Sequence, residues 1–376
     1  MKGTMRQAWL VAPGGPWEIR EVPIPEPGPG QMLVKIHCGS ICKQTDSNTI
    51  RALHPPHDHQ CWGMVPHHMR QWDGREDPLK DVYPKRHLLY TAEPFPSRMG
   101  HEMSGEVIEY VPLAEHPKGG DNVGLFSSYN AFKPGDRVTG SPIYGGFAEY
   151  VVLDFDAAHK FPESLSYEAA TLAEPVACVS PHVMNTVQFR DRVVVLGVGA
   201  LGFASMCIAK AMGASQVVVV DKVQSKLDFA LKHGADVAIN ASLVENVADA
   251  IWDATEGQGA DAILEVAGEP ETIQLIPYIG RIGARVGQIG ACCVPVAIDW
   301  SYFHFRAMSI NKYDIGGWFG TNPHRGFELA IDLITNGIVP MQEFIDYRFE
   351  LNLENLNKAF DLAMNDPQMR KAMFTF

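Results

Sequence analysis

One ten-residue stretch constrains the fold of this chain more than any other. Residues 193–202 read VVVLGVGALG, an apolar run that passes into the spacing G-x-G-x-x-G, and residues 203–212 continue as an apolar helix. In a strand–turn–helix unit Gly197 permits the tight turn, Gly199 lets the backbone approach a diphosphate, and Gly202 permits close packing of the helix. The helix N-terminus then faces the negative charge. The pattern predicts a βαβ unit that binds a dinucleotide.

The next predicted strand, residues 216–220, ends at an acidic residue. Asp221 follows QVVVV, about 20 residues beyond Gly202, where a carboxylate can accept hydrogen bonds from the adenosine ribose hydroxyls. The same carboxylate would repel a 2′-phosphate, so the pattern favours NAD over NADP. Three further residues near the turn are assigned to cofactor contacts: Ala200, Leu201 and Ala267.

The predicted secondary structure changes along the chain. The first 160 residues read as short strands divided by glycine and proline, which is typical of an all-β, barrel-like module. From about residue 176 to 309, mostly apolar strands alternate with helices, which predicts a parallel sheet covered on both faces. These strands are expected at 193–196, 216–220, 262–266 and 284–288. The tail returns to mixed character and is expected to pack on the first module.

Composition and charge narrow the class of protein. Of 376 residues, 46% are hydrophobic and 20% are charged, which is the range of folded globular proteins. A net charge of −13 disfavours nucleic acid and anionic membranes as partners. No stretch has the length of a signal-peptide core or a membrane span, and the seven cysteines include no C-x-x-C pair. We expect reduced thiols, a cytoplasmic location and a small-molecule ligand.

Four residues form a candidate metal site. Cys42, the pair His101 and Glu102, and Glu174 are all zinc-ligand types, and most stand beside a glycine or proline that can end a helix or strand. A catalytic zinc takes about three protein ligands and leaves a position for water or substrate. The alternative is coincidence, because one cysteine, one histidine and two glutamates occur in most long chains.

Taken together, the motifs resemble those of the zinc-dependent medium-chain dehydrogenase/reductase family, and in particular the branch of sorbitol and threonine dehydrogenases. The resemblance spans nearly the whole chain. It is carried, in the family's order, by the cofactor fingerprint at 193–221 and by five other segments: VKIHCGSICKQTD at 34–46, GHEMSGEV at 100–107, KPGDRV at 133–138, GGFAEYV at 145–151 and AEPVACVSPHV at 173–183.

The resemblance implies roles for individual residues. Cys42 and His101 correspond to zinc ligands. Glu102 and Glu174 each correspond to an acidic residue that ligates zinc directly or through water, and which of the two ligates the resting metal stays open. Thr45 corresponds to the hydroxyl that passes on the substrate proton. Lys226 corresponds to a lysine at the adenosine ribose, and Lys371 corresponds to a basic residue near the cofactor phosphates.

The resemblance also implies a domain plan. It makes residues 1–175 a GroES-like β-barrel catalytic domain and 176–310 a Rossmann doubly wound NAD-binding domain, an α/β architecture. Residues 311–376 would complete the catalytic domain. The family assembles as homodimers or homotetramers, so we expect a homo-oligomer.

The chain departs from the family pattern in four places, one of which is Asn48, where many alcohol dehydrogenases have a histidine that passes on the substrate proton. Two residues, rather than one, stand between Cys42 and Thr45, so the loop is one residue longer. Residues 103–144 contain no cysteine, whereas the family's structural zinc needs four there, so we expect one zinc per subunit. The chain between Cys42 and His101 is longer than in the family, so most of 51–99 is an insertion.

The insertion at about 51–99 is rich in histidine, tryptophan and proline. It could bind a second metal, but a rigid aromatic wall over the substrate or a subunit contact fits its composition better. Such a wall would favour bulky or aromatic alcohols.

The sequence thus predicts an NAD- and zinc-dependent dehydrogenase that converts an alcohol, including bulky, aromatic or polyol alcohols, into an aldehyde or ketone. Two alternatives stay open. One is a zinc-free NAD(P)H reductase of activated double bonds, which would lack the cysteine, histidine and glutamate set. The other is a nucleotide-binding protein without turnover.

Overall fold

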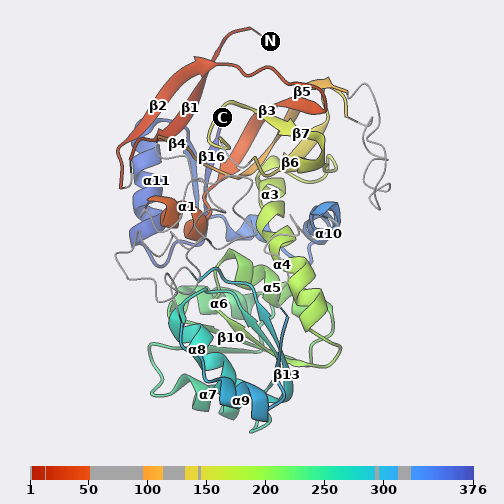
Figure 1. Cartoon of the computed structure of the whole chain (residues 1–376), viewed down its shortest axis with the longest axis vertical. Helices are drawn as coiled ribbons and strands as arrows, with labels where there is room; N and C mark the ends of the chain where they lie inside the picture. Colours follow the sequence, from red (N-terminus) through yellow and green to blue (C-terminus); the bar gives the residue numbers. More distant parts are fainter. Residues whose placement is uncertain are drawn as a thin grey trace, which may run out of the picture. The chain divides into compact units, whose positions relative to one another are not determined.

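The computed structural model describes residues 2–12, 14–50, 96–112, 132–142, 145–292, 296–311 and 323–376. The chain forms two compact units (Figure 1). The first unit combines Met1–Glu174 with Met341–Phe376, and the second is Pro175–Pro340. Most of the insertion, residues 51–95, lies outside the described residues, so the predicted aromatic wall or subunit contact stays a prediction.

The first unit is built on two sheets. A three-stranded sheet has the order β2-β1-β4, and a seven-stranded sheet has the order β15-β16-β3-β5-β6-β8, with β7 paired to β3. The strands of the small sheet are β1 (Thr4–Leu10), β2 (Trp17–Pro23) and β4 (Ser97–Arg98). The strands of the large sheet are β3 (Gln31–Ser40), β5 (Glu102–Val111), β6 (Arg137–Gly140), β7 (Tyr150–Asp154), β8 (Ala158–Lys160), β15 (Tyr347–Glu350) and β16 (Ala372–Thr375).

Pairing in the large sheet is antiparallel between β3, β5, β6 and β8, which gives the β-rich module that the sequence predicts. Strands β3 and β5 have ten residues each, and their pairing runs from Gln31 with Val111 to Ser40 with Glu102. Strand β7 begins at Tyr150. Before it, Ala148 forms an isolated bridge to Gln7 of β1, which links the two sheets.

Short helices and the chain terminus complete the first unit. They are α1 (Lys43–Ile50), α3 (Tyr167–Thr171), α11 (Leu353–Asn365) and the 3-10 turns η3 (Phe155–Ala157) and η4 (Met341–Phe344). Trp17 and Phe360 stack with ring centroids 4.4 Å apart, and Phe147 packs against Phe360 and Phe374 in the same buried cluster. Burial of these aromatic rings fixes α11 on the small sheet.

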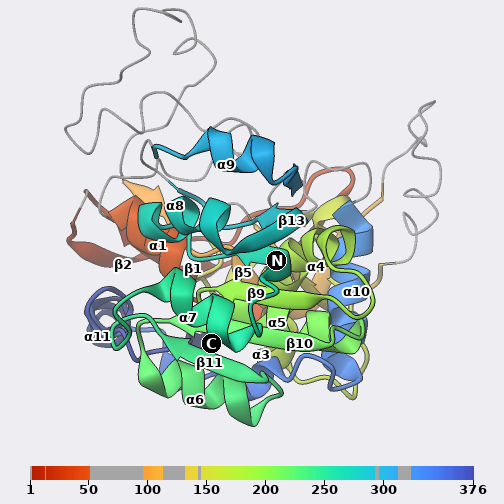
Figure 2. The same cartoon turned by 90° about the horizontal axis from the view of Figure 1, so that it is seen from below.

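The second unit is a six-stranded parallel sheet with the order β11-β10-β9-β12-β13-β14, and Figure 2 shows β9, β10 and β11 side by side. This is the order 3-2-1-4-5-6 of a doubly wound dinucleotide-binding sheet. The strands are β9 (Arg192–Leu196), β10 (Gln216–Asp221), β11 (Val237–Asn240), β12 (Ala260–Glu265), β13 (Gly280–Gln288) and β14 (Ser309–Asn311). The predicted parallel sheet is confirmed.

Helices precede, connect and follow these strands. They are α4 (Ala173–Thr186), α5 (Ala200–Ala211), α6 (Gln224–Lys232), α7 (Val247–Ala254), α8 (Pro270–Ile279), α9 (Trp300–Phe305) and α10 (Pro323–Thr335). Apolar residues of α7, α8 and α9 join the strands in a core that includes Val194, Val218 and Ile263. Side-chain oxygens of Asn246 and Asp299 cap α7 and α9 by accepting backbone N–H groups at the first turn.

The boundary after the second unit differs from the expected position. The sequence places the end of the nucleotide-binding domain near residue 310, but the second unit extends to Pro340. The reason is α10, where a side chain at Gly326 would lie 3.3 Å from the Ala177 carbonyl of α4. Only the residues after 340 return to the first unit, where β15 and β16 extend the large sheet.

Among the helices that the structure describes, none combines the length and the apolar character that a membrane crossing requires.

Candidate active site

The glycine turn of the second unit has the geometry that its sequence predicts. Gly197 has φ +99°, and a side chain at Gly202 would lie 1.9 Å from the Gly197 carbonyl oxygen, so only glycine fits there. Helix α5 begins directly after Gly199, and a side chain at Gly199 would meet nothing within 4 Å. Open space therefore stands before the first N–H groups of α5, where a diphosphate can bind. Ala200 and Leu201 form the first turn of this helix.

Asp221 ends β10 beside this turn. Its Oδ2 accepts a hydrogen bond from the Val198 backbone nitrogen at 2.7 Å, and its Oδ1 accepts one from Val223 at 2.9 Å. These two bonds orient the carboxylate at the carboxyl end of the sheet and leave lone pairs for further donors. Lys226 lies in the first turn of α6 and is 9% exposed. Ala267 faces Gly197 across the sheet edge, because a side chain at Gly197 would lie 3.0 Å from the Ala267 Cβ.

Cys42 stands between β3 and α1 in the first unit. The Asp46 backbone N–H donates to the Cys42 carbonyl at 3.0 Å, and the Cys42 backbone N–H donates to Asp46 Oδ2 at 2.9 Å. The extra residue of this loop is thus absorbed in the first helical turn, which brings Asp46 back to Cys42. Thr45 lies in the same turn and is half-buried. Its predicted proton-transfer role stays a prediction.

A close crossing of two backbone segments positions His101. Gly100 has φ +89°, and a side chain there would lie 2.8 Å from the Phe147 backbone nitrogen. The Gly146 N–H donates to the Gly100 carbonyl at 2.9 Å, which ties the GGF segment to the residue before His101. The imidazole is 3% exposed, immediately before β5. The backbone therefore fixes where the ring points.

Asp46 also orients the imidazole. His101 Nδ1 faces Asp46 Oδ1 at 3.6 Å, and Asp46 is completely buried. Burial lowers the pKa of His101, but interactions with Asp46 and Cys42 outweigh it and raise that pKa well above its ordinary value. A carboxylate behind one ring nitrogen is the usual arrangement of a metal-binding histidine, and it leaves Nε2 for the metal. Sequence reasoning missed Asp46, although it follows the predicted Thr45.

Glu102 is held on both carboxylate oxygens. Ser40 donates a hydrogen bond to Oε2, and Lys371 Nζ lies 2.8 Å from Oε1 and 2.6 Å from Oε2. The exposed fractions of the Lys371 and Glu102 side chains are 3% and 1%. Burial lowers the pKa of Lys371, but the charges of Glu102, Cys42 and Glu174 raise it above its ordinary value. Lys371 is therefore a buried cation next to the candidate metal ligands.

The ligand atoms of three predicted residues lie together. One atom each from Cys42, His101 and Glu102 lies within 4.8 Å of the others. Sulfur, nitrogen and carboxylate oxygen are the donors that a four-coordinate zinc takes, so the residues present fit this metal. Glu174, in the first turn of α4 and 4% exposed, is outside that triplet but is near enough to act electrostatically on Lys371. The resemblance places Lys371 near the cofactor phosphates, whereas the structure shows its ammonium on Glu102.

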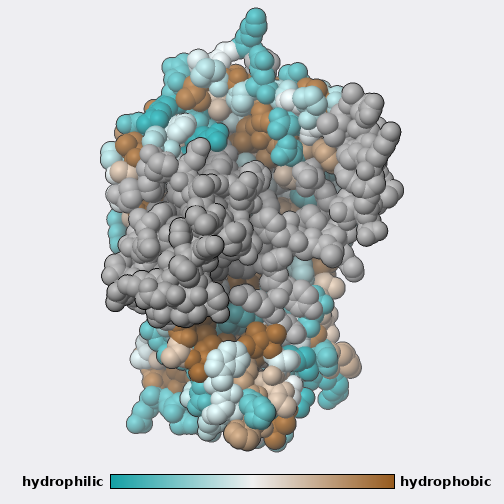
Figure 3. All heavy atoms as spheres, viewed as in Figure 1, coloured by the Kyte–Doolittle hydropathy of each residue, from teal (hydrophilic) through white to brown (hydrophobic). Residues whose placement is uncertain are grey.

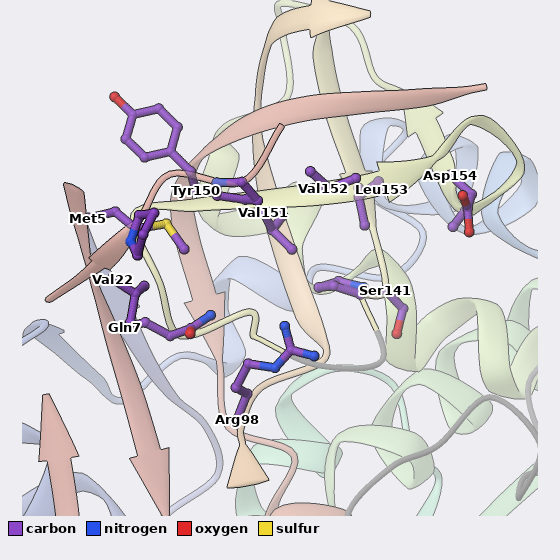
Figure 4. A pocket seen from close by; sticks show the side chains of 14 residues that line it. Met5, Gln7, Val22, Arg98, Ser141, Tyr150, Val151, Val152, Leu153 and Asp154 are labelled. Carbon is purple, nitrogen blue, oxygen red and sulfur yellow. The ribbon is translucent and has the colours of Figure 1, made fainter. Parts of the chain in front are cut away.

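A cavity of about 290 Å³ also opens in the first unit, between the small sheet and β7. Gln7, Arg98, Ser141 and Tyr150 line it together with apolar side chains (Figure 4). None of the candidate metal ligands is among its lining residues.

Comparisons with known proteins show which proteins this chain resembles. The family model of the alcohol dehydrogenase GroES-like domain matches residues 78–163, and that of zinc-binding dehydrogenases matches residues 200–336. L-threonine 3-dehydrogenase of Pyrococcus furiosus is 30% identical over 358 residues, which cover 92% of this chain and 91% of that protein. The corresponding enzyme of Pyrococcus horikoshii is 28% identical, covering 93% and 92%.

A solved structure has the same fold. The 2R,3R-butanediol dehydrogenase of Bacillus subtilis superposes with a TM-score of 0.73 at 20% identity and covers 99% of each chain. The α/β architecture of a GroES-like barrel and a Rossmann sheet is therefore confirmed. The chain belongs to the zinc-dependent medium-chain dehydrogenase/reductase family. It is an oxidoreductase of the dehydrogenase class, whose cofactors are zinc and a nicotinamide nucleotide.

Proposed function

We propose that this chain is an NAD-dependent alcohol dehydrogenase with one catalytic zinc per subunit. The observation that carries the proposal is the triplet of Cys42, His101 and Glu102, whose ligand atoms lie within 4.8 Å of one another. The orientation of Asp221 beside the glycine turn supports NAD as the cofactor. The zinc-free reductase is disfavoured, because enzymes of that class would lack the cysteine, histidine and glutamate set.

The residues of the first unit have different roles around the metal. Cys42, His101 and Glu102 would hold zinc, with Glu174 as a further acidic ligand or water partner. Zinc supplies Lewis acidity that lowers the pKa of a bound alcohol and assists hydride transfer to nicotinamide. Asp46 fixes the imidazole, and Thr45 would accept and pass on the alcohol proton.

The substrate is an alcohol whose carbon carries the transferred hydride. The relatives named L-threonine 3-dehydrogenase add a hydroxy amino acid to the bulky, aromatic and polyol alcohols expected from the sequence. A panel of these alcohols, with NADH absorbance as the signal, tests the proposal directly. Elemental analysis of the same preparation should give one zinc per chain. Two tightly bound zincs, or a protein inactive on every alcohol class when zinc-loaded, would contradict it.

An apolar surface on the second unit supports the expected homo-oligomer. Trp300 and Phe305 of α9 are 62% and 81% exposed, and Ile282 of β13 is 72% exposed. In Figure 3 the part of this face where Figure 1 draws α9 and β13 carries hydrophilic and hydrophobic atoms side by side. Strand β14 stands at the end of the sheet order with one neighbour, β13. We propose that a second copy of this chain covers this surface, and the mass of the protein in solution tests it.

Replacement of Lys371 by methionine should destabilise the metal-free protein by about 3 kcal/mol, because it leaves the Glu102 carboxylate buried without its cation. Zinc should recover part of this loss, since a metal ion can compensate the same charge. The measurement is the melting temperature with and without zinc, and zinc should raise it more in Lys371→Met than in the wild type.

The matched control is Arg348→Met, which removes a more exposed ion pair with Glu168, where the two side chains are 43% and 25% exposed. That change should cost under about 1 kcal/mol, with the same zinc effect as the wild type. If zinc raises the melting temperature of all three proteins equally, Lys371 does not balance charge at the metal site.

A further inference from the structure

A completely buried glutamate, outside the metal cluster and the glycine turn, ends strand β12 of the second unit. Glu265 Oε1 accepts hydrogen bonds from the Ala267 nitrogen at 3.0 Å, the Gly268 nitrogen at 2.9 Å and Thr272 Oγ1 at 2.8 Å. Its Oε2 accepts one from Gln288 Nε2 at 2.6 Å. Four donors converge on one side chain; burial raises the pKa of Glu265, and these hydrogen bonds offset part of that rise.

These contacts join two segments that leave neighbouring strands. Ala267 and Gly268 follow β12, while Gln288 ends β13 and its Nε2 also donates to the Gly290 carbonyl at 3.2 Å. The segments touch, because a side chain at Gly290 would lie 2.2 Å from the Gly268 nitrogen. The Gly290 backbone N–H donates to the Glu265 carbonyl at 2.9 Å. Glu265 thus holds the carboxyl ends of β12 and β13 together through its side chain and its backbone.

The strand order shows which part of a dinucleotide meets this edge. A doubly wound sheet binds a dinucleotide across its carboxyl edge, one nucleotide to each half of the sheet. The half with β9, β10 and β11 contains the glycine turn and Asp221, which take the diphosphate and the adenosine. The other half begins with β12 and β13. We therefore expect the segments that Glu265 holds to form the surface on which the nicotinamide nucleotide binds.

We propose that Glu265 is a positioning residue for the nicotinamide half of the cofactor: its four accepted hydrogen bonds lock residues 267–268 against residues 288–290 and shape the surface on which that half binds. The inference rests on the proposed nicotinamide-dependent function. It assigns Glu265 no contact with the reacting atoms and no role in adenosine binding.

The effect of Glu265→Gln follows from the donor pattern. If the amide oxygen keeps the three donors on Oε1, the new NH₂ group faces Gln288 Nε2, a second donor. Gln288 could turn its own oxygen toward that NH₂, but it would then face the Gly290 carbonyl with an acceptor. Either arrangement loosens the 288–290 segment. Strands β9 to β11 and Asp221 keep their contacts.

The test compares two ligands that share the adenosine half. We would measure dissociation constants for NADH and for ADP-ribose by titration of the zinc-loaded full chain. For Glu265→Gln, the constant for NADH should rise about tenfold, the size expected for the loss of one hydrogen bond to a charged group, while that for ADP-ribose changes by less than about twofold. The fluorescence of bound NADH should also change, since it reports the surroundings of the nicotinamide ring.

Asp261→Asn is the matched control. Asp261 is a buried carboxylate in the same strand, but it stands near the amino end and accepts hydrogen bonds from the Arg192 backbone nitrogen at 2.8 Å and from Arg192 Nε at 2.9 Å. This variant weakens the same unit without touching the carboxyl edge. Its affinities for NADH and ADP-ribose should keep the wild-type ratio.

Thr272→Val removes one donor to Glu265 and leaves the charge in place, so it serves if Glu265→Gln does not fold. We expect a rise of about threefold in the NADH constant, with ADP-ribose unaffected. Equal loss of both ligands, or no loss of either, in the folded variants would overturn the positioning role. A wild-type protein that binds neither NADH nor ADP-ribose would instead refute the proposed function itself.

Discussion

Cys42→Ala is expected to remove zinc and dehydrogenase activity together. The thiolate is one of three clustered ligand atoms, and its loss leaves a histidine and a glutamate that Lys371 already neutralises. Changes in residues that only support metal ligands cost about 10–100-fold in affinity or activity, so loss of a ligand should cost more than about 100-fold. Zinc content after dialysis and kcat/KM on the best alcohol measure the two effects.

Cys38→Ala provides the matched control. Cys38 lies on β3, four positions before Cys42, is 4% exposed, and burial raises the pKa of its thiol to about 12. Its loss should leave zinc content and kcat/KM near wild-type values. If Cys42→Ala retained one zinc and full activity, the assignment of the metal site to this triplet would be wrong.

Asp221→Ser should lower kcat/KM with NAD by about 10–100-fold, because the carboxylate would accept charge-assisted hydrogen bonds from the ribose. The value with NADP should change much less or rise, since the charge that repels a 2′-phosphate is gone. The preference for NAD over NADP should therefore be smaller in Asp221→Ser than in the wild type. Steady-state kinetics with both cofactors at a fixed alcohol concentration give the comparison. A wild-type preference for NADP would contradict the role of Asp221 in selecting NAD.

The control for this variant is Asp236→Ser. Asp236 Oδ2 accepts a hydrogen bond from the Val217 nitrogen at 2.6 Å, so it supports the opposite end of the same strand β10. Asp236 also pairs with Lys210 on the surface. Its replacement should lower activity with NAD and NADP by the same factor. Equal changes in Asp221→Ser would mean that Asp221 acts only by holding the turn.

The sequence by itself determined the features that depend on neighbouring residues. The glycine spacing after an apolar strand predicts the turn that the structure shows at Gly197, and the strand ending at Asp221 lies where the pattern indicates. The alternation of strands and helices predicts the parallel sheet. For the glycine turn, Asp221 and the parallel sheet, local spacing and chemistry are enough. Cys42 and His101-Glu102 are zinc-ligand types, but coincidence stayed an alternative until their motifs were compared with those of the family.

Only the tertiary structure decided what surrounds these residues. Glu102 meets Lys371 across 269 positions of sequence and Ser40 across 62, and neither contact leaves a mark in local periodicity. The end of the second unit at Pro340 likewise depends on where α10 packs. Glu265 reads in the sequence as one acid at the end of an apolar strand, yet its four donors come from three separate turns of chain. Buried charges need partners wherever the fold can bring them, so their environment is a property of packing and not of sequence spacing.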